Sequence, residues 1–363
     1  INLATSLGSA LVGSIYVLDE PSVGLHPEDT LKLIEILLNL KKIGNSVIVV
    51  EHDEDIIRSA DHIIDLGPGA GSQGGDVVAS GNIKKILKSD SLTSGYLNGS
   101  LNIDIPESRR KISKKLSLTG CRENNLKNIN VDFPLNMIVC ITGLSGSGKT
   151  TLVKNILYPA LLKSKGVFKE KPGQFDQVEG DLAEINSIEY IDQNPIGQSS
   201  RSNPATYIKV YDEIRNLFSN QKTSKHFGLK PKHFSFNVDG GRCDECKGEG
   251  SIKIEMQFMS DIVLKCETCK GKRFKKEVLK AKFVNKNIDD ILNLTIQDAY
   301  NFFQENNQTK ITNKLKALLD VGMGYVKLGQ SSSTLSGGEA QRIKLASFLL
   351  SLIHISEPTR RAI

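Results

Sequence analysis

The sequence lacks any long run of apolar residues: no stretch approaches the roughly 18 residues that a helix needs to cross a bilayer. We therefore expect no membrane association. The N-terminus also lacks the basic start, apolar stretch and cleavage site of a signal peptide. Because the chain does not begin with methionine, we expect the natural start to lie upstream. These absences together predict a cytoplasmic protein.

Neither sign of charge dominates: 47 lysines and arginines against 41 acidic residues leave a net charge of +6 on 363 residues. The distribution is uneven, because residues 222–286 carry 16 basic and 8 acidic side chains and the rest of the chain sums to −2. A local basic excess can attract a polyanion such as DNA, although a solvated lysine-rich surface has the same composition. The hydrophobic share of 39% is ordinary for a soluble globular protein with room for two or three domains.

Cysteine is scarce, but four of the six cysteines form two CxxC pairs separated by 19 residues. This spacing is typical of a structural zinc site with four cysteine ligands, because each pair supplies two thiolates from one tight turn. A redox CxxC is the alternative, and the presence of two pairs disfavours it. Residues 252–264 between the pairs predict a β-hairpin. The predicted zinc ligands are Cys243, Cys246, Cys266 and Cys269, whereas Cys121 and Cys140 are interpreted as ordinary strand or core cysteines.

The first hundred residues predict a parallel α/β unit. Apolar runs at 15–18, 46–50 and 63–66 predict strands, and helical periodicity lies between them at 28–44 and 53–60. A glycine-rich loop at 67–75 follows the third run, and residues 1–14 resemble the end of a helix.

A linker and a second unit follow. Residues 96–115 lie in a stretch rich in serine, asparagine and charge. Residues 116–142 alternate as β-structure and end in the apolar run Met137–Ile141, which we expect to be a strand. Residues 143–162 pass from a glycine-rich loop into a helix, residues 288–320 have a helical pattern, and another helix is expected to begin near Glu339.

Residues Gly143–Thr150 match the phosphate-binding motif GxxxxGK[ST] in full. Glycines let backbone N–H groups surround phosphate oxygens, and the N-terminus of the following helix adds partial positive charge. Lys149 is expected to reach the β- and γ-phosphates, and the Thr150 hydroxyl to ligate Mg²⁺. A chance Gly/Ser loop is the alternative. The predicted ATP-binding residues here are Gly143, Ser145, Gly146, Gly148, Lys149, Thr150 and Thr151.

The predicted strand at 15–18 ends in the two carboxylates Asp19 and Glu20. At the end of a buried strand, Asp19 could hold Mg²⁺ through water and Glu20 could polarise an attacking water. His52 follows the next strand, at the edge where ligands bind in open α/β sheets, and could contact the γ-phosphate. Taken singly, each residue could equally be a solvated strand end or an exposed histidine.

Leu335–Glu339 is a Leu-Ser-Gly-Gly-Glu turn that opens a helix and offers a second anion-binding device. Together with the phosphate loop, the Asp-Glu strand and His52, it resembles the motif set of ABC ATPases. The resemblance implies that Ser336, Gly337, Gly338 and Glu339 close on ATP held by another nucleotide-binding unit. It also implies that Gln193 is the Q-loop glutamine and that Ser22–His26 is the D-loop.

Among ABC ATPases the chain resembles the UvrA family over residues 1 to about 349. The stretches that carry the resemblance are Val17–His26, Glu51–Glu54, Asp65–Gly71, Arg201–Tyr207, Gly240–Cys243 and Leu335–Leu345. Gln198 departs from the family, where an arginine is expected. The resemblance implies an α/β fold with P-loop ABC ATPase nucleotide-binding domains and an inserted four-cysteine zinc module. It further implies ATP, Mg²⁺ and Zn²⁺ as cofactors, and damaged double-stranded DNA, UvrB and a second copy of the whole protein as partners.

The resemblance also implies the domain organisation. Residues 1–95 correspond to the end of a first nucleotide-binding unit and 116–349 to most of a second, with the zinc insert at about 230–280. Ile1–Leu7 resembles Ile343–Leu349, as expected for repeated units. Residues 350–363 depart from the family and are expected to be a non-native tail. Beside the zinc pairs, the implied phosphate contacts are Lys270, Lys272, Arg273, Lys275 and Lys276.

The predicted function is therefore ATP-dependent recognition of DNA damage in nucleotide excision repair. Two alternatives are weighed against it. A UvrA-like ATPase of drug self-resistance would keep the same motifs, whereas an ATPase subunit of a membrane transporter has no evident need for a zinc hairpin. Because the Asp-Glu strand and the phosphate loop belong to different units, we expect this chain alone to hydrolyse ATP poorly.

Overall fold

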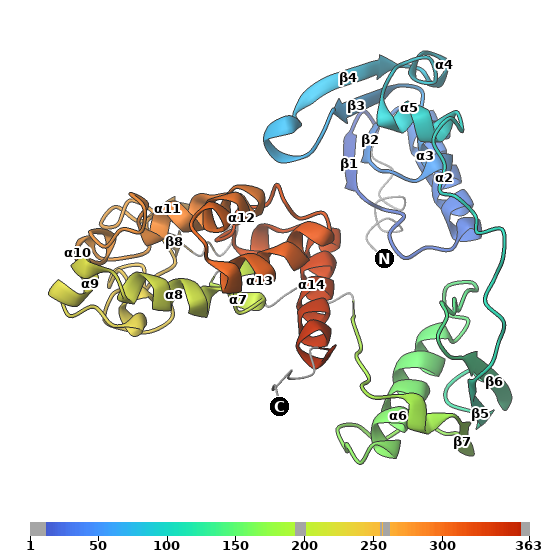
Figure 1. Cartoon of the computed structure of the whole chain (residues 1–363). Coiled ribbons are helices and arrows are strands. Elements are labelled where there is room, and N and C mark those ends of the chain that lie inside the picture. Colours follow the sequence, from blue (N-terminus) through green and yellow to red (C-terminus); the bar gives the residue numbers. More distant parts are fainter. Residues whose placement is uncertain (1–11, 193–200, 255, 257–261, 357–363) are drawn as a thin grey trace. The chain divides into compact units, whose positions relative to one another are not determined.

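The computed structural model describes residues 12–192, 201–254, 256 and 262–356 (Figure 1). The chain divides into two compact units, Ile1–Tyr190 and Ile191–Ile363. Among the described residues, no helix combines the length and apolar character needed to cross a membrane. Most of the helix end expected within residues 1–14 lies outside the described residues. The predicted Q-loop glutamine Gln193 also lies outside them.

The first unit begins with a parallel pair of strands, β1 (Ile15–Asp19) and β2 (Ser46–Val50), which confirms the predicted parallel α/β arrangement for these strands. The helices α2 (Pro27–Lys42) and α3 (Glu54–Ser59) cover one face of the pair (Figure 1). The buried side chains of this layer and the strand residues packed on them are Leu33, Leu37, Ile56, Leu18, Val47 and Val49. This packing fixes both strand ends relative to each other.

The third predicted strand does not join this parallel pair. β3 (Ile63–Gly67) instead pairs antiparallel with β4 (Asp76–Gly81), which the sequence did not predict. The antiparallel pairing with β4 follows from the short glycine-rich connection, which contains only the 3₁₀ turn η1 (Gly71–Gln73). Such a loop turns the chain straight back, whereas a parallel neighbour needs a crossover of a dozen or more residues.

Two short helices follow, α4 (Ile83–Ile86) and α5 (Leu92–Leu97). Residues 102–114 then carry neither helix nor strand. Ile103 and Ile105 in this stretch are more than three-quarters exposed, so it has little packing of its own.

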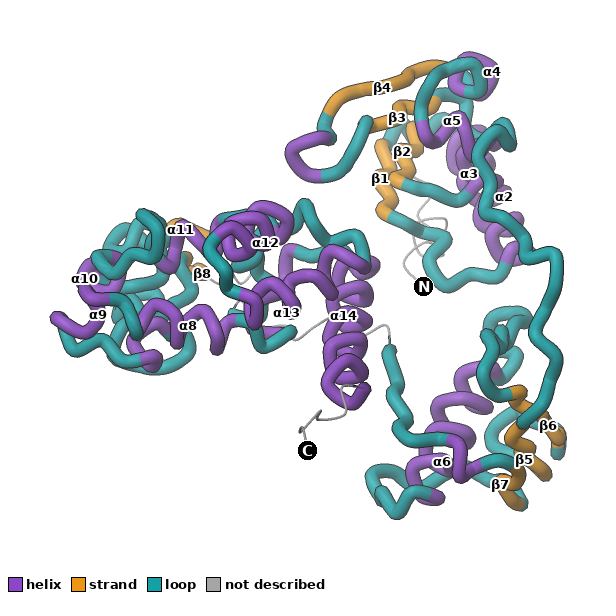
Figure 2. Tube along the Cα trace, in the orientation of Figure 1, coloured by secondary structure: helices purple, strands orange, loops and turns teal. Residues whose placement is uncertain are grey.

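The rest of the first unit is a three-stranded antiparallel sheet in the order β6-β5-β7. Its strands are β5 (Lys115–Cys121), β6 (Ile129–Pro134) and β7 (Gln177–Gly180). A helical segment packs on this sheet (Figure 2). It consists of η2, which is a π-type stretch, followed by α6. The 3₁₀ turn η3 comes after β7. Their bounds are η2 (Thr151–Leu157), α6 (Tyr158–Ser164) and η3 (Leu182–Glu184). Leu116, Leu118, Leu152 and Ile156 form the buried centre between sheet and helix.

The expected strand Met137–Ile141 does not form. The residues have no strand assignment, Ile138 is 99% exposed, and Cys140 is exposed rather than in a core. An apolar strand of a parallel sheet is stable only between hydrogen-bonded neighbours, and no described strand lies beside this one. Cys121, by contrast, is buried in β5 as predicted.

The second unit is mainly helical (Figure 2). Its helices are α7 (Pro204–Tyr207), α8 (Tyr211–Ser219), α9 (Lys222–His226), α10 (Lys276–Leu279), α11 (Ile288–Asn293), α12 (Ile296–Glu305), α13 (Thr309–Asp320) and α14 (Gly337–Ser356). Two 3₁₀ turns, η4 (Pro231–Phe234) and η5 (Ser332–Thr334), lie among them. The region 288–320 is helical as predicted, but Thr295 and Gln308 cap two further helices within it and so divide it into three.

One continuous core runs through this unit. Its largest fully buried side chains are aromatic: Phe218, Phe234, Phe236, Phe274 and Phe303. Beside it stands the antiparallel hairpin of β8 (Ser251–Ile254) and β9 (Ile262–Lys265), which confirms the predicted hairpin. Because Phe236 and Phe274 flank the cysteine segments in the chain, the core anchors the base of this hairpin.

Candidate functional site

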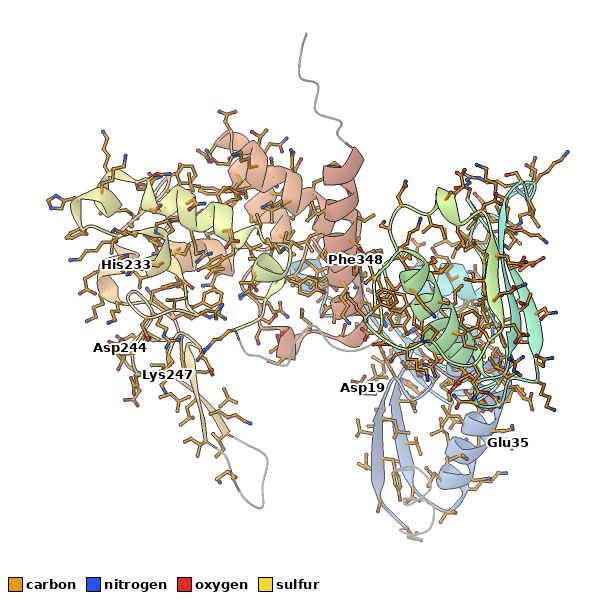
Figure 3. The ribbon with its side chains drawn as sticks, turned by 90° about the horizontal axis from the view of Figure 1, so that it is seen from below. Asp19, Glu35, His233, Asp244, Lys247 and Phe348 are labelled. Carbon is orange, nitrogen blue, oxygen red and sulfur yellow. The ribbon has the colours of Figure 1, made fainter. Side chains whose placement is uncertain are left out.

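The carboxylate of Glu20, directly after β1, lies beside the histidine that follows β2. Asp19 is the last residue of β1 and is in register with Val50 of β2 (Figure 3). Glu20 turns out of the strand with φ 43°, held by its N–H donating to the Val50 carbonyl at 2.9 Å. The His52 Nδ1 atom then lies 3.9 Å from Glu20 Oε1. The parallel register therefore brings the predicted acidic and histidine groups to one edge of the sheet.

A residue without a predicted role, Glu51, ties these two strand ends together. Its Oε1 accepts a hydrogen bond from the Ser22 N–H at 2.8 Å, and its Oε2 accepts from the N–H groups of His52 at 2.9 Å and Asp53 at 3.2 Å. Partial burial raises the pKa of Glu51, but hydrogen bonds from Ser22, His52 and Asp53 outweigh it and hold that pKa below its ordinary value. An acidic residue directly between an apolar strand and a histidine was the available sequence signal.

The predicted phosphate loop is an open turn in front of η2. Gly143, Gly146 and Gly148 have φ values of 141°, 80° and 103°, in the region that only glycine enters without strain. Lys149 folds back on the loop, and its Nζ donates to the carbonyls of Gly143 at 2.6 Å and Leu144 at 2.8 Å. The lysine ammonium therefore lies within the loop, where a phosphate would need a cation.

Two asparagines brace this loop from outside the motif. Asn125 Nδ2 donates to the Gly146 carbonyl at 2.8 Å, and Asn124 Nδ2 donates to Thr151 Oγ1 at 3.2 Å. Both lie in the connection between β5 and β6. Sequence reasoning assigned no role to either one, because the contact depends on the sheet and not on spacing along the chain.

The Leu-Ser-Gly-Gly-Glu segment forms a capping box at the start of α14. The Ser336 Oγ accepts from the Glu339 N–H at 3.3 Å, and Glu339 Oε2 accepts from the Ser336 N–H at 2.8 Å. Glu339 Oε1 also accepts from the Tyr325 hydroxyl at 2.7 Å, and Arg342 donates to that hydroxyl at 3.2 Å. Gly337 and Gly338 face open space. The two glycines are thus available at a helix N-terminus, while the Glu339 carboxylate is engaged within the fold.

The four predicted zinc ligands come together in one buried cluster. Their sulfur atoms all lie within 4.8 Å of one another, with 3.9 Å from Cys243 to Cys266 and 3.6 Å from Cys246 to Cys269. Each pair is followed by the same turn: Lys247 and Gly248 have φ 49° and 88°, and Lys270 and Gly271 have φ 51° and 81°. Asp244 and Lys247 lie at the base of the hairpin (Figure 3). Two matching turns at one hairpin therefore form the cluster.

The cluster fits a zinc ion. Zn–S bonds of about 2.3 Å in a tetrahedron place the sulfurs roughly 3.8 Å apart, close to the two distances above. All four cysteines are free thiols, far from disulfide contact. Burial above all raises the pKa of Cys269 to about 12, so a nearby cation is required for four thiolates to coexist. The Glu245 carboxylate lies against the cluster, where its Oε2 accepts a hydrogen bond from the Cys266 thiol at 3.4 Å.

The basic residues beside the cluster are not equivalent. Lys270, Lys272 and Lys276 are exposed. Lys275 instead forms an ion pair with Asp244 at 2.7 Å, and the Arg273 guanidinium lies 5.7 Å from the ring centre of Phe236, where burial lowers its pKa. Of the five predicted contacts, the three exposed lysines are the ones that have the freedom that phosphate contact requires.

A short segment joins the cluster to the start of α14. Arg201 pairs with Glu249 of the zinc module at 3.4 Å. The next residue, Ser202, accepts a hydrogen bond at its carbonyl from the Ser332 N–H at 2.8 Å, a few residues before Ser336. The buried Asn203 then caps α7 through Thr206. The second unit therefore contains a continuous polar path between the two predicted sites.

Comparison with known proteins shows which proteins share this sequence and fold. No family model matches the chain. Over 351 residues it is 55% identical to UvrABC system protein A of Clostridium tetani, covering 96% of this chain and 37% of that protein. The corresponding protein of Aquifex aeolicus is 54% identical over 348 residues, and that of Staphylococcus epidermidis is 50% identical over 367 residues. The chain spans 37% and 39% of their respective lengths.

The fold gives the same result. The crystal structure of UvrA2 from Deinococcus radiodurans superimposes with a TM-score of 0.90 at 44% identity, covering 96% of this chain and 42% of that one. The strands, the phosphate loop, the four-cysteine hairpin and the serine-glycine turn thus occur together in an ABC ATPase fold with an inserted cysteine module. Over the length that it spans, the chain belongs to the UvrA family.

Proposed function

We propose that this chain contributes parts of two nucleotide-binding units to ATP-dependent recognition of damaged double-stranded DNA and to loading of UvrB in nucleotide excision repair. The observation that carries the proposal is its match to UvrABC system protein A at 50–55% identity over 95% or more of the chain. The relatives are named for the UvrABC system, and nothing in the described residues favours drug self-resistance. We further propose the cytoplasm as compartment and a homodimer of the whole protein.

The geometry supports a specific division of the nucleotide chemistry among these residues. The phosphate loop would bind the phosphates, with Lys149 exchanging its carbonyl partners for phosphate oxygens and the Thr150 hydroxyl on Mg²⁺. Bound Mg²⁺ would neutralise charge on the phosphates. At the other half-site, Asp19 would hold a Mg²⁺-bound water, Glu20 would polarise the attacking water, and His52, whose Nδ1 lies 3.9 Å from Glu20 Oε1, would contact the γ-phosphate. Gln193 would contribute near the metal.

We propose that these halves belong to different ATP sites. Ser336, Gly337 and Gly338 would close on nucleotide held by a phosphate loop other than Gly143–Thr150. The 363-residue chain alone should therefore hydrolyse ATP poorly. Phosphate release from the purified chain tests this, with a full-length UvrA-family protein as the positive reference. Turnover at the rate of that reference, abolished by Lys149→Ala, would refute the assignment of the halves to separate sites.

The zinc module is proposed to couple nucleotide state to DNA contact. Four thiolates on Zn²⁺ would hold both CxxC turns, change the net charge of residues 222–286 from +8 to about +6, and position the exposed lysines toward DNA phosphates. The path from Glu249 through Arg201 and Ser332 supports a connection to the serine-glycine turn. Asp19, Glu20 and His52 at the sheet edge and the cysteine cluster would thus act in the same cycle of ATP binding and hydrolysis.

The test replaces Cys243 and Cys266 by serine in a full-length UvrA-family protein that contains this segment. Zinc content and the affinity ratio for damaged against intact duplex are measured, and the matched control is Cys140→Ser, an exposed cysteine outside the cluster. We expect loss of about one zinc and of discrimination, with the control unchanged. Discrimination that survives zinc loss would limit the module to a structural role. If the unsubstituted protein never prefers damaged DNA, the repair assignment fails.

A further inference from the structure

We infer that Asn125 is a positioning residue for the phosphate loop, and that it sets nucleotide affinity by holding the loop open. The inference rests on the proposed role of Gly143–Thr150 in nucleotide binding. Asn125 lies outside that motif, 21 residues before Gly146, and reaches the loop only because β5 and β6 place their connection beside it.

The contact acts on the orientation of one peptide plane. The Asn125 amide donates to the Gly146 carbonyl at 2.8 Å and so directs that oxygen toward the β5–β6 connection. In a planar trans peptide the N–H points opposite to the carbonyl. The Ser147 N–H is therefore directed into the loop, where it donates a hydrogen bond to the Leu144 carbonyl at 3.1 Å. Inward N–H groups are what a phosphate-binding loop needs.

The same side chain also limits how the loop can collapse. A Cβ built on Gly148 would lie 3.0 Å from Asn125 Oδ1 and 2.9 Å from Leu126 Cδ2, so this glycine backbone rests against the β5–β6 connection. Gly148 has φ 103°, in a region that favours glycine, and a glycine backbone has more accessible conformations than that of any other residue. Asn125 therefore hydrogen-bonds Gly146 on one side of Ser147 and occupies the space beside Gly148 on the other.

The β5–β6 connection is itself anchored by residues outside the phosphate loop. Glu123 Oε2 accepts from the Gln174 N–H at 2.8 Å, and the Arg122 N–H donates to the Gln174 carbonyl at 2.8 Å. Arg122 also forms an ion pair with Asp176 at 2.5 Å. Asn125 thus links the anchored β5–β6 connection to the glycine-rich phosphate loop and restricts the conformations of that loop.

The experiment measures the affinity of the 363-residue chain for MgATP, inorganic tripolyphosphate and AMP by calorimetry. For Asn125→Ala we expect the Kd for MgATP and for tripolyphosphate to rise about fivefold to tenfold, the worth of one hydrogen bond, while AMP is unchanged. Asn125→Asp keeps the size but cannot donate, and its carboxylate should weaken both phosphate ligands further. A general loss of folding would instead reduce all three affinities and the Tm.

The matched control is Asn130→Ala. Asn130 is on the same hairpin and also makes one side-chain bond to a backbone group, accepting from the Gly120 N–H at 2.9 Å, but that bond does not involve the phosphate loop. It should leave the Kd for MgATP as in the unsubstituted chain. Lys149→Ala tests the loop itself and should abolish phosphate-dependent binding.

The outcomes distinguish a failure of the role inferred for Asn125 from a failure of the proposed nucleotide site. Unchanged MgATP affinity in Asn125→Ala, with binding lost in Lys149→Ala, overturns the inference and leaves the proposed nucleotide site intact. Binding of MgATP by the unsubstituted chain that Lys149→Ala does not alter overturns the proposed site, and the inference with it. An equal loss in Asn125→Ala and Asn130→Ala means a structural effect of the hairpin and also overturns the inference.

Discussion

Glu51 accepts a hydrogen bond from the backbone N–H of Ser22 at 2.8 Å, across the ends of two neighbouring parallel strands. The same carboxylate accepts from the His52 N–H. Glu51→Gln replaces one acceptor oxygen by an amide that cannot accept, so we expect one of these contacts to be lost. Backbone amide exchange at either Ser22 or His52 should accelerate about fivefold to tenfold, as for loss of one hydrogen bond. Glu54→Gln, at a carboxylate that pairs with Arg58, is the control. Equal exchange in both variants would contradict the prediction.

The same carboxylate predicts a pH dependence. Hydrogen bonds from Ser22, His52 and Asp53 outweigh the effect of burial and hold the pKa of Glu51 below its ordinary value of 4.5. A depressed folded-state pKa stabilises the fold above the unfolded value, and that stabilisation is lost as pH falls through the folded value. Protection of the Ser22 amide should therefore persist at pH 4.5 and disappear at lower pH. A Glu51 carboxyl titration by NMR with a midpoint at or above 4.5 would exclude this.

Tyr325 and Glu339 should be energetically coupled. The Tyr325 hydroxyl donates to Glu339 Oε1 at 2.7 Å, and Glu339 also completes the capping box with Ser336. Tyr325→Phe should destabilise the chain by about 1 kcal/mol and Glu339→Ala by about 1–2 kcal/mol. In a double-mutant cycle the two losses should overlap by about 1 kcal/mol, measured by chemical denaturation. Strictly additive losses would show that the contact contributes nothing.

Gly248 should tolerate no side chain. It has φ 88°, and a Cβ there would lie 2.2 Å from the Phe236 carbonyl oxygen, which is backbone and cannot move aside. Gly248→Ala should therefore destabilise the second unit by about 3 kcal/mol or more. Gly228 is the matched control, because it has φ 64° but open space, and Gly228→Ala should cost only about 1 kcal/mol. Chemical denaturation followed by circular dichroism measures both, and equal losses would contradict the steric argument.

Thiol reactivity should report zinc binding. Of the six cysteines, Cys140 is exposed and Cys121 is buried in β5, while the other four form the cluster. In the zinc-loaded chain one thiol should react rapidly with a disulfide reagent, and Cys140→Ser should remove that phase. A chelator should release about one zinc and expose four further reactive thiols. Five fast thiols before any chelator is added would show that the cluster binds no metal.

The sequence by itself determined the local chemistry of this protein. A full GxxxxGK[ST] motif, an apolar strand ending in Asp19-Glu20 and two CxxC pairs 19 residues apart are local patterns, and each can be recognised within a short stretch of sequence. For the same reason the strands β1 and β2, the helix α14 and the hairpin between the cysteine pairs could be predicted. Short-range geometry suffices for all of them.

Only the tertiary structure decided which residues meet. Strand pairing is non-local, so the sequence could not show that β3 turns back on β4 or that Met137–Ile141 has no neighbour among the described strands. Glu51 and Asn125 escaped prediction for the same reason: each is an ordinary polar residue in sequence. Each gains its partner, Ser22 or Gly146, only when two segments 29 or 21 residues apart are packed together. Hydrogen bonds of this kind exist only in the assembled sheet, because the unfolded chain leaves the same groups bonded to water.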